Sequence, residues 1–246
     1  METLTQTRHV DIPGAHNVRD TGGYPAADGC TTRWLTLFRS GRLNAPESVR
    51  RLADMGVRTV VDLRGDGEIA RMPDACAEWP GIAYRHIPLT PAHIRTNGDR
   101  PANLEGQNER YLEESSRQIA RVLQVLAQPN AFPAVVHCTA GKDRTGLIIA
   151  LLLALVGVPD NVIADDYVLS LHHAAPVLKA LRIEGTVSGW DMEHLERMLE
   201  CRREVMTHTL DVLRRRHGGV ERYLSQAGVW LADIRALHAA LAEPAR

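Results

Sequence analysis

Short apolar runs and longer helical patterns divide this chain into two halves. Four short runs rich in β-branched and other apolar residues predict strands, at 34–40, 57–64, 82–89 and 132–138. The last two runs are separated by a polar segment and by apolar residues at helical spacing over 105–127. After Cys138 the pattern is almost entirely helical: it predicts one apolar helix that ends at about Val156, and further helices over 160–172, 192–216, 220–227 and 231–241.

Strands joined through helices, followed by a helical C-terminal half, predict an α/β fold with a mostly parallel central sheet flanked by helices. No repeat, low-complexity linker or break in composition divides the chain, so residues 1–246 are predicted to form a single domain. Ligands of open parallel sheets bind beyond the carboxyl ends of the strands, and Cys138 lies at such an end. We therefore expect the functional site beside Cys138.

Composition and charge narrow the class of protein further. With 29 basic and 30 acidic residues, the net charge of −1 gives no indication of a nucleic-acid-binding surface. Cys30, Cys76 and Cys201 are scattered without a C-x-x-C pair and are interpreted as small buried hydrophobic residues. The N-terminus lacks a signal-peptide profile and the longest apolar run, 147–156, is too short to span a bilayer. A cytoplasmic location is expected, although export without a cleaved signal would leave no trace here.

The segment from Cys138 to Arg144 joins the last predicted strand to an apolar helix. A loop entering a helix offers unpaired backbone N–H groups and the positive end of the helix dipole, which together bind a tetrahedral oxyanion. Gly141 permits close backbone approach, and Arg144 can clamp two phosphate oxygens. The same positive field stabilises Cys138 as a nucleophilic thiolate. The residues predicted to bind phosphate are those of the loop: Thr139, Ala140, Gly141, Lys142, Asp143 and Arg144.

Two residues after the loop are expected to support this chemistry. Thr145 can donate its hydroxyl to the sulfur and favour its departure when a phosphocysteine is hydrolysed. Gly146 is expected to let the following helix pack tightly against the sheet.

The stretch HCTAGKDRTG, which begins at His137, fits the H-C-x5-R-[ST]-G signature of cysteine-dependent protein tyrosine phosphatases. The flanking stretches HNVRDTGGY, FRSGRL, DLRGDGEI and VERYL resemble a bacterial branch of that family over nearly the whole chain. This resemblance implies the cysteine-phosphatase fold and hydrolysis of phosphotyrosine, and of phosphoserine or phosphothreonine, through a phosphocysteine intermediate. The proposed chemistry needs neither a cofactor nor a metal.

The proposed chemistry needs a carboxyl group that donates a proton to the leaving oxygen and later activates water. The WPG stretch at 79–81 has glycine where a Trp-Pro-Asp loop would carry that acid, so we interpret it as a turn. Asp143 is the preferred candidate, and the resemblance supports it because the related bacterial enzymes share this aspartate. Asp62, at the end of the second predicted strand, and Asp66 remain alternatives.

Three further assignments stay open at this stage. Lys142 is either a point charge at the phosphate site, which in related enzymes accompanies activity on phosphoinositides, or a solvent-facing lysine. Arg19 is expected, with Asn17, to fix the N-terminal segment against the loop, and direct substrate contact by Arg19 is the alternative. The polar stretch 90–111 is either a lid over the active site or a surface excursion.

Two alternative functions follow from the same residues. A phosphoinositide phosphatase would use the same loop on a lipid headgroup, and a phosphate-binding module would use it without turnover. A metal enzyme is not expected, because His172 and His173 are adjacent and no Cys/His spacing matches a zinc site.

Overall fold

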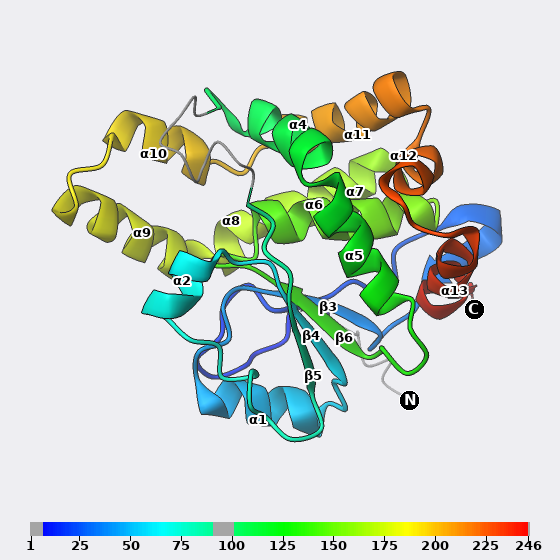
Figure 1. The fold of residues 1–246 in the computed structure, drawn as a ribbon, viewed down its shortest axis with the longest axis horizontal. Helices are drawn as coiled ribbons and strands as arrows, with labels where there is room; N and C mark the ends of the chain where they lie inside the picture. Colours follow the sequence, from blue (N-terminus) through cyan, green and yellow to red (C-terminus); the bar gives the residue numbers. More distant parts are fainter. Residues whose placement is uncertain (1–6, 91–100, 246) are drawn as a thin grey trace.

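The computed structural model describes residues 7–90 and 101–245, and it has the predicted α/β fold (Figure 1). Its five-stranded sheet has the order β1-β3-β6-β4-β5. The four parallel strands are the predicted ones, each shorter than its apolar run; the fifth strand, β1, pairs antiparallel with β3. The bounds of the strands are β1 (Arg19–Asp20), β3 (Leu37–Ser40), β4 (Thr59–Asp62), β5 (Ala83–His86) and β6 (Ala134–His137).

The sheet is covered on both faces, which explains why its strands read as continuous apolar runs. Successive side chains of a strand point to opposite faces. In β6, Val136 belongs to the core cluster that contains the C-terminal helices, whereas Val135 belongs to the cluster beneath α1 (Pro46–Asp54). The register pairs His137 with both Ser40 and Asp62, so the carboxyl ends of three strands meet next to Cys138.

Helix α6 (Asp143–Leu155) follows β6 and is the central helix of the C-terminal half. Ten of its thirteen residues are buried, as expected for a helix that is apolar on all sides. It contacts α7 (Asp160–Val168), α12 (Val220–Ala227) and α13 (Leu231–Leu241) as well as the sheet. The N-terminus of α6 is thereby held rigidly at the edge of the sheet where Cys138 lies.

Three predicted helices are each divided into two. The pattern over 105–127 forms α4 (Leu104–Glu114) and α5 (Ser116–Leu126), which are separated at the buried Ser115. The pattern over 160–172 forms α7 and α8 (Ser170–His173), and that over 192–216 forms α10 (Met192–Leu199) and α11 (Arg203–His217). Apolar spacing continues across each break, so the sequence pattern did not reveal them.

Helices α1, α2 (Asp66–Arg71) and α9 (Ala175–Val187) were not predicted from the sequence. In α9 the buried residues are Val177, Leu178 and Gly185, too few for an apolar stripe along the whole helix. Figure 1 shows α9 and α10 extending together as an antiparallel pair at one end of the molecule.

Several smaller expectations can be compared with the structure. The WPG stretch at 79–81 is a turn before β5, as predicted. Of the lid predicted at 90–111, residues 91–100 lie outside the described residues, and 104–111 belong to α4, which packs on α11. No helix in the described part of the chain combines the length and apolarity that a bilayer-spanning segment needs.

A segment of the N-terminal half and the C-terminal end of the described chain pair in a two-stranded sheet that the sequence did not indicate. Strand β2 (Cys30–Thr32) pairs antiparallel with β7 (Ala242–Pro244). Cys30 is therefore partly exposed, and its interpretation as a buried residue was wrong. Cys76 and Cys201 are buried, as predicted.

Candidate active site

The loop from Cys138 to Arg144 turns between β6 and α6, and its shape requires glycine at its centre. Gly141 has φ of +67°, and a Cβ atom there would lie 2.3 Å from the carbonyl oxygen of Ser40. The backbone N–H of Arg42 donates to the carbonyl of Thr139 at 3.1 Å. The loop is therefore pressed against the segment that follows β3.

The outer side of the loop is held through its carbonyl groups. The Asn17 side-chain amide donates to the carbonyl oxygens of Ala140 and Gly141, at 2.8 and 2.9 Å. The Arg39 guanidinium donates to the carbonyls of Gly141 and Lys142, at 2.7 and 3.3 Å. In a trans peptide the N–H points opposite the C=O. The amides that follow these carbonyls, those of residues 141–143, therefore point away from this face, toward the pocket beside Cys138.

These carbonyl-binding groups are themselves fixed by one buried carboxylate, Asp166 of α7. Asp166 pairs with Arg39 and with Arg19, whose Nε lies 3.5 Å from its Oδ1, and all three side chains are at most 1% exposed. Burial opposes the charge of Asp166, but Arg39 and Arg19 outweigh it and lower the pKa of this carboxyl. Burial and the charge of Arg39 lower the pKa of Arg19 to about 10.

Arg19 reaches the loop through Asn17 and lies outside the pocket. Its guanidinium donates to the side-chain oxygen of Asn17 and to the backbone carbonyl of Asp166. Arg19 is fully buried and does not line the pocket that contains Cys138, so the structure does not place it in contact with a substrate.

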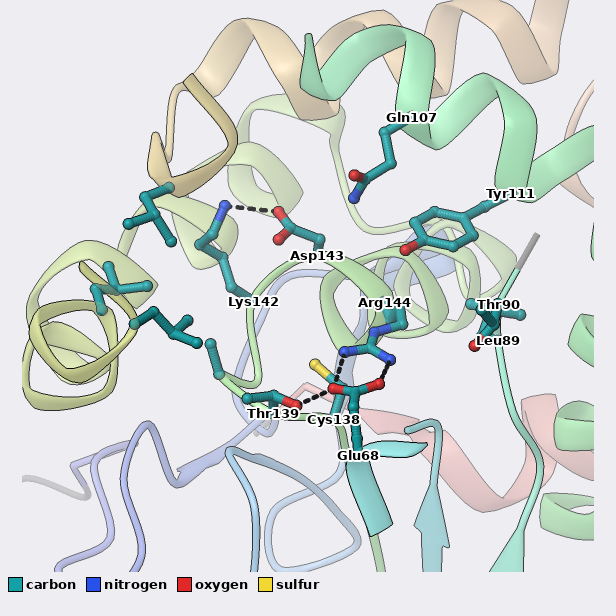
Figure 2. A pocket seen from close by; sticks show the side chains of 14 residues that line it. Glu68, Leu89, Thr90, Gln107, Tyr111, Cys138, Thr139, Lys142, Asp143 and Arg144 are labelled. Atoms are coloured by element: carbon teal, nitrogen blue, oxygen red, sulfur yellow. Dashed lines mark hydrogen bonds and ion pairs between the residues drawn. The ribbon is translucent and has the colours of Figure 1, made fainter. Parts of the chain in front are cut away.

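A pocket of about 240 Å³ opens over Cys138 (Figure 2). Its polar wall consists of loop residues together with Glu68, and α4 contributes Gln107 and Tyr111. The apolar part of its lining consists of Leu89, Leu178, Leu181 and Leu199. The structure thus brings the nucleophile candidate, the arginine and aliphatic side chains from three distant segments into one cavity.

Glu68 of α2 is a charged site residue that sequence reasoning missed. Its carboxylate accepts two hydrogen bonds from the Arg144 guanidinium, at 2.6 and 2.8 Å, and another from the Thr139 hydroxyl. Although burial alone would raise the pKa of Glu68, the bonds and charge of Arg144 lower it to about 2. Glu68 also accepts from the backbone N–H of Gly65 at 2.8 Å. Such a cap, three residues before the glutamate, is a helix-start signal in DLRGDGEI.

Lys142 lies in the lining of the pocket and is buried rather than facing solvent. It is 1% exposed, so the solvent-facing alternative was wrong. Its ammonium donates to Asp143 at 2.7 Å and to the backbone carbonyls of Met198 and Glu200, at 3.2 and 2.6 Å. All three donors of this ammonium are thereby used within the protein, at the C-terminal end of α10.

Of the three candidate general acids, the structure places Asp143 in the pocket. Asp143 Oδ1 accepts from Lys142 and, at 2.9 Å, from the Tyr167 hydroxyl. Asp62 is buried against Arg64, and Asp66 is on the surface with its side chain 92% exposed. Neither of these two lines the pocket.

The Asp62 carboxylate belongs to a buried network directly behind Cys138. Arg64 Nη2 lies 2.7 Å from Asp62 and 3.0 Å from Asp74, and His137 Nε2 lies 3.4 Å from Asp74. Burial opposes the charge of Asp62, but His137 and Arg64 outweigh it and hold the pKa of this carboxyl well below its usual range. Asp62, Asp74 and His137 are close enough to share a metal ion, but Arg64 already supplies a cation to both carboxylates.

Thr145 and Gly146, the two residues that follow the loop, have different surroundings. Thr145 is fully buried, and its hydroxyl has no hydrogen-bond partner among the residues that the structure describes. A Cβ atom at Gly146 would lie 3.0 Å from the Tyr167 ring and 3.5 Å from Arg39. Gly146 thus permits close packing both against α7 and against the Arg39 side chain of strand β3.

Comparison with known proteins agrees with this geometry. A family model described as "Tyrosine phosphatase family" matches residues 10–243. The chain belongs to this family. The predicted family and class of enzyme are therefore confirmed.

Two curated relatives and one solved structure illustrate the range of similarity to this phosphatase. "Triple specificity protein phosphatase PtpB" of Mycobacterium tuberculosis is 27% identical, over 94% of this chain and 98% of the relative. A "Tyrosine-protein phosphatase" of Nostoc commune is 31% identical, over 78% of this chain and 68% of the relative. TpbA of P. aeruginosa, solved with pTyr, is 17% identical over 86% of this chain and 98% of its own, with a TM-score of 0.42.

The Glu68–Arg144 pair generates a prediction about this phosphatase. We expect Glu68→Gln to lower kcat/KM on an aryl phosphate roughly tenfold or more, because a charged hydrogen-bond pair is worth about 1.5–3 kcal/mol. The matched control is Glu78→Gln, an exposed glutamate outside the pocket, which should leave kcat/KM unchanged. Equal activity of the two variants would show that Arg144 needs no such partner.

Glu68→Gln should also change the pH dependence of stability. The pKa of Glu68 falls from its ordinary 4.5 to about 2 in the folded chain. Its contribution to the free energy of unfolding is thus present above pH 4.5 and lost as pH falls toward 2. In urea titrations, the variant should lose less stability than the wild type across that range.

Proposed function

We propose that residues 1–246 act as one phosphatase domain that hydrolyses phosphotyrosine, and also phosphoserine or phosphothreonine, through a phosphocysteine on Cys138. The observation that carries this proposal is the binding of the loop carbonyls by Asn17 and Arg39. It turns the amides of the loop toward the pocket, where they can hold the phosphoryl oxygens without reorganising.

In the first step, the Cys138 thiolate attacks phosphorus. The S–P bond forms as the bond from phosphorus to the ester oxygen breaks, and Asp143 gives its proton to that oxygen. Oδ1 of Asp143 is engaged by Lys142 and Tyr167, whereas Oδ2 accepts no hydrogen bond from a described residue. Oδ2 is therefore the oxygen assigned to proton transfer.

In the second step, water attacks the phosphocysteine. Asp143, now a carboxylate, takes the proton of the water, and the S–P bond breaks with its electron pair returning to sulfur. The hydroxyl of Thr145, which has no partner among residues 7–90 and 101–245, is available to donate to the departing thiolate. Arg144 and the loop amides hold the inorganic phosphate until it leaves the site.

The walls of the pocket support an aromatic ester as the preferred substrate. Leu89, Leu178 and Leu199 present apolar surface around the opening, and Tyr111 supplies a ring. Apolar and aromatic walls with a few polar groups are typical of sites for such ligands. Phosphoinositides remain the alternative substrate, but Lys142, the residue that suggested them, is engaged within the protein. A cytoplasmic location likewise remains a prediction.

Substitution of the nucleophile tests the covalent mechanism. Cys138→Ser should retain binding of a phosphotyrosine peptide in calorimetry while its turnover falls at least about a thousandfold, since the hydroxyl is not ionised at neutral pH. Cys30→Ser, a partly exposed cysteine outside the pocket, is the matched control and should keep full activity. Appreciable turnover by a verified Cys138→Ser protein would contradict the mechanism.

The role of Asp143 is tested by varying the leaving group. Asp143→Asn should slow phosphotyrosine peptides about a hundredfold, within the usual contribution of general acid–base catalysis. The rate at which p-nitrophenyl phosphate phosphorylates the enzyme, measured as the initial burst of nitrophenolate, should fall far less because nitrophenolate leaves without a proton. Asp66→Asn is the control for the exposed alternative. If Asp66→Asn shows the larger leaving-group dependence, the proton donor has been misassigned.

A further inference from the structure

A second pocket adjoins the catalytic one and is not used by the reaction described above. Its volume is about 430 Å³, and it shares Glu68, Thr139 and Leu181 with the lining of the catalytic pocket. The remaining lining residues come from the segments around α2 and α9 and from the segment that follows β3: Arg42, Arg64, Arg71, Met72, Glu184 and Trp190. A substrate seated over Cys138 would extend into it.

The charges of this second pocket do not cancel. Arg64 is paired with Asp62 and Asp74, and Glu68 is paired with Arg144. Those charges are satisfied within the protein. The remaining charged groups of the lining are two arginines and one glutamate, Arg42, Arg71 and Glu184. These three groups together leave a net charge of +1 in the described lining of the pocket.

Arg42 is the member of this set best placed to meet a substrate. Its backbone N–H donates to the Thr139 carbonyl at 3.1 Å, which fixes its position beside the catalytic loop. Its guanidinium is partly exposed and makes no hydrogen bond or ion pair with any residue of the described ranges. Arg71 is 69% exposed, lies 3.8 Å from Glu184 and donates to the Gly67 carbonyl.

The other side of the pocket is apolar. Trp190, which is 40% exposed, lines it together with Leu181 and Met72. An aliphatic chain that ends in a single negative charge therefore fits the pocket better than a second phosphate, which carries about −1.5 to −2. Glu184 would also repel a more highly charged group.

We propose that this second pocket binds an acidic side chain, aspartate or glutamate, close to the phosphorylated residue of a peptide substrate. Arg42 meets the carboxylate with support from Arg71, and Trp190 and Leu181 contact the methylenes. This inference rests on the proposed function, because it makes the second pocket a specificity site for the same reaction. It assigns the residues around Arg42 to the recognition of phosphoproteins rather than of lipid headgroups.

The test uses pairs of phosphotyrosine peptides that differ by one glutamate or glutamine. The glutamate or glutamine is placed in turn at each of the three positions before and the three positions after the phosphotyrosine. At one position or more, the wild type should show kcat/KM about threefold higher for glutamate, the size expected for a partly exposed ion pair. Arg42→Gln should bring that ratio to one.

Because the measured quantity is a ratio, a general loss of activity in the variant does not affect it. Arg85→Gln, an exposed arginine outside both pockets, is the matched control and should keep the wild-type ratio. A wild-type ratio of one at all positions would overturn the proposal, and so would an Arg42→Gln protein that keeps the preference for glutamate.

Two further measurements separate the possible failures. Hydrolysis of p-nitrophenyl phosphate by the wild type tests the proposed function alone, and its absence would remove the basis for both proposals. Turnover of phosphatidylinositol bisphosphate in phosphatidylcholine vesicles tests whether the second pocket binds the negative charge of a lipid headgroup instead. If Arg42→Gln lowers vesicle turnover and leaves the peptide ratio unchanged, the pocket recognises a lipid headgroup and the peptide proposal is wrong.

Discussion

Two buried arginines share one buried carboxylate in this protein, and the shape of the loop from Cys138 to Arg144 depends on that arrangement. Arg19 and Arg39 both pair with Asp166, which cannot satisfy all of their donors. Buried donors must find other partners, and the carbonyl groups of the loop provide them, directly for Arg39 and through Asn17 for Arg19. The two buried arginines thus hold the loop in the shape that we propose for binding phosphate.

Two further ion networks complete the surroundings of Cys138, the proposed nucleophile. Behind Cys138, Arg64 joins Asp62 and Asp74 next to His137, and within the pocket Glu68 orients Arg144. The loop is therefore fixed from its outer side, from behind and at its terminal arginine in the absence of substrate. Groups that are already oriented toward the developing charge cost no reorganisation during the reaction, which is the main advantage of such a site.

The sequence was sufficient where the determining interactions are local. The apolar runs located the four parallel strands, and the spacing of Cys138, Gly141 and Arg144 identified the loop, because strand burial and loop shape depend on neighbouring residues. The breaks at Ser115 and before α11 escaped detection because apolar spacing continues across them. Composition gave no hint of the pairing of β2 with β7, which joins residues about two hundred positions apart.

The distinction between local and long-range interactions also applies within the site. The burial of Lys142 was not evident from the sequence because its partners, the carbonyls of Met198 and Glu200, lie 56 and 58 residues away. Glu68 lies 76 residues from Arg144, and only its local role as a helix cap was visible in the sequence. Residues whose function is set by long-range partners could not be assigned from their neighbours.

The central claim is that Arg39 organises the cradle by binding the loop carbonyls, and oxyanion affinity measures this directly. Arg39→Met leaves Arg19 and Asp166 as a matched pair, so the fold can be retained. Arg33→Met is the control, since Arg33 also donates to backbone carbonyls, those of Ala240 and Ala242, far from the loop in the β2–β7 region. In calorimetric titration with inorganic phosphate, the Kd of Arg39→Met should rise about tenfold or more, because charged hydrogen bonds that hold the loop are lost. The Kd of Arg33→Met should stay at the wild-type value. Equal phosphate affinity in the two folded variants would contradict the account.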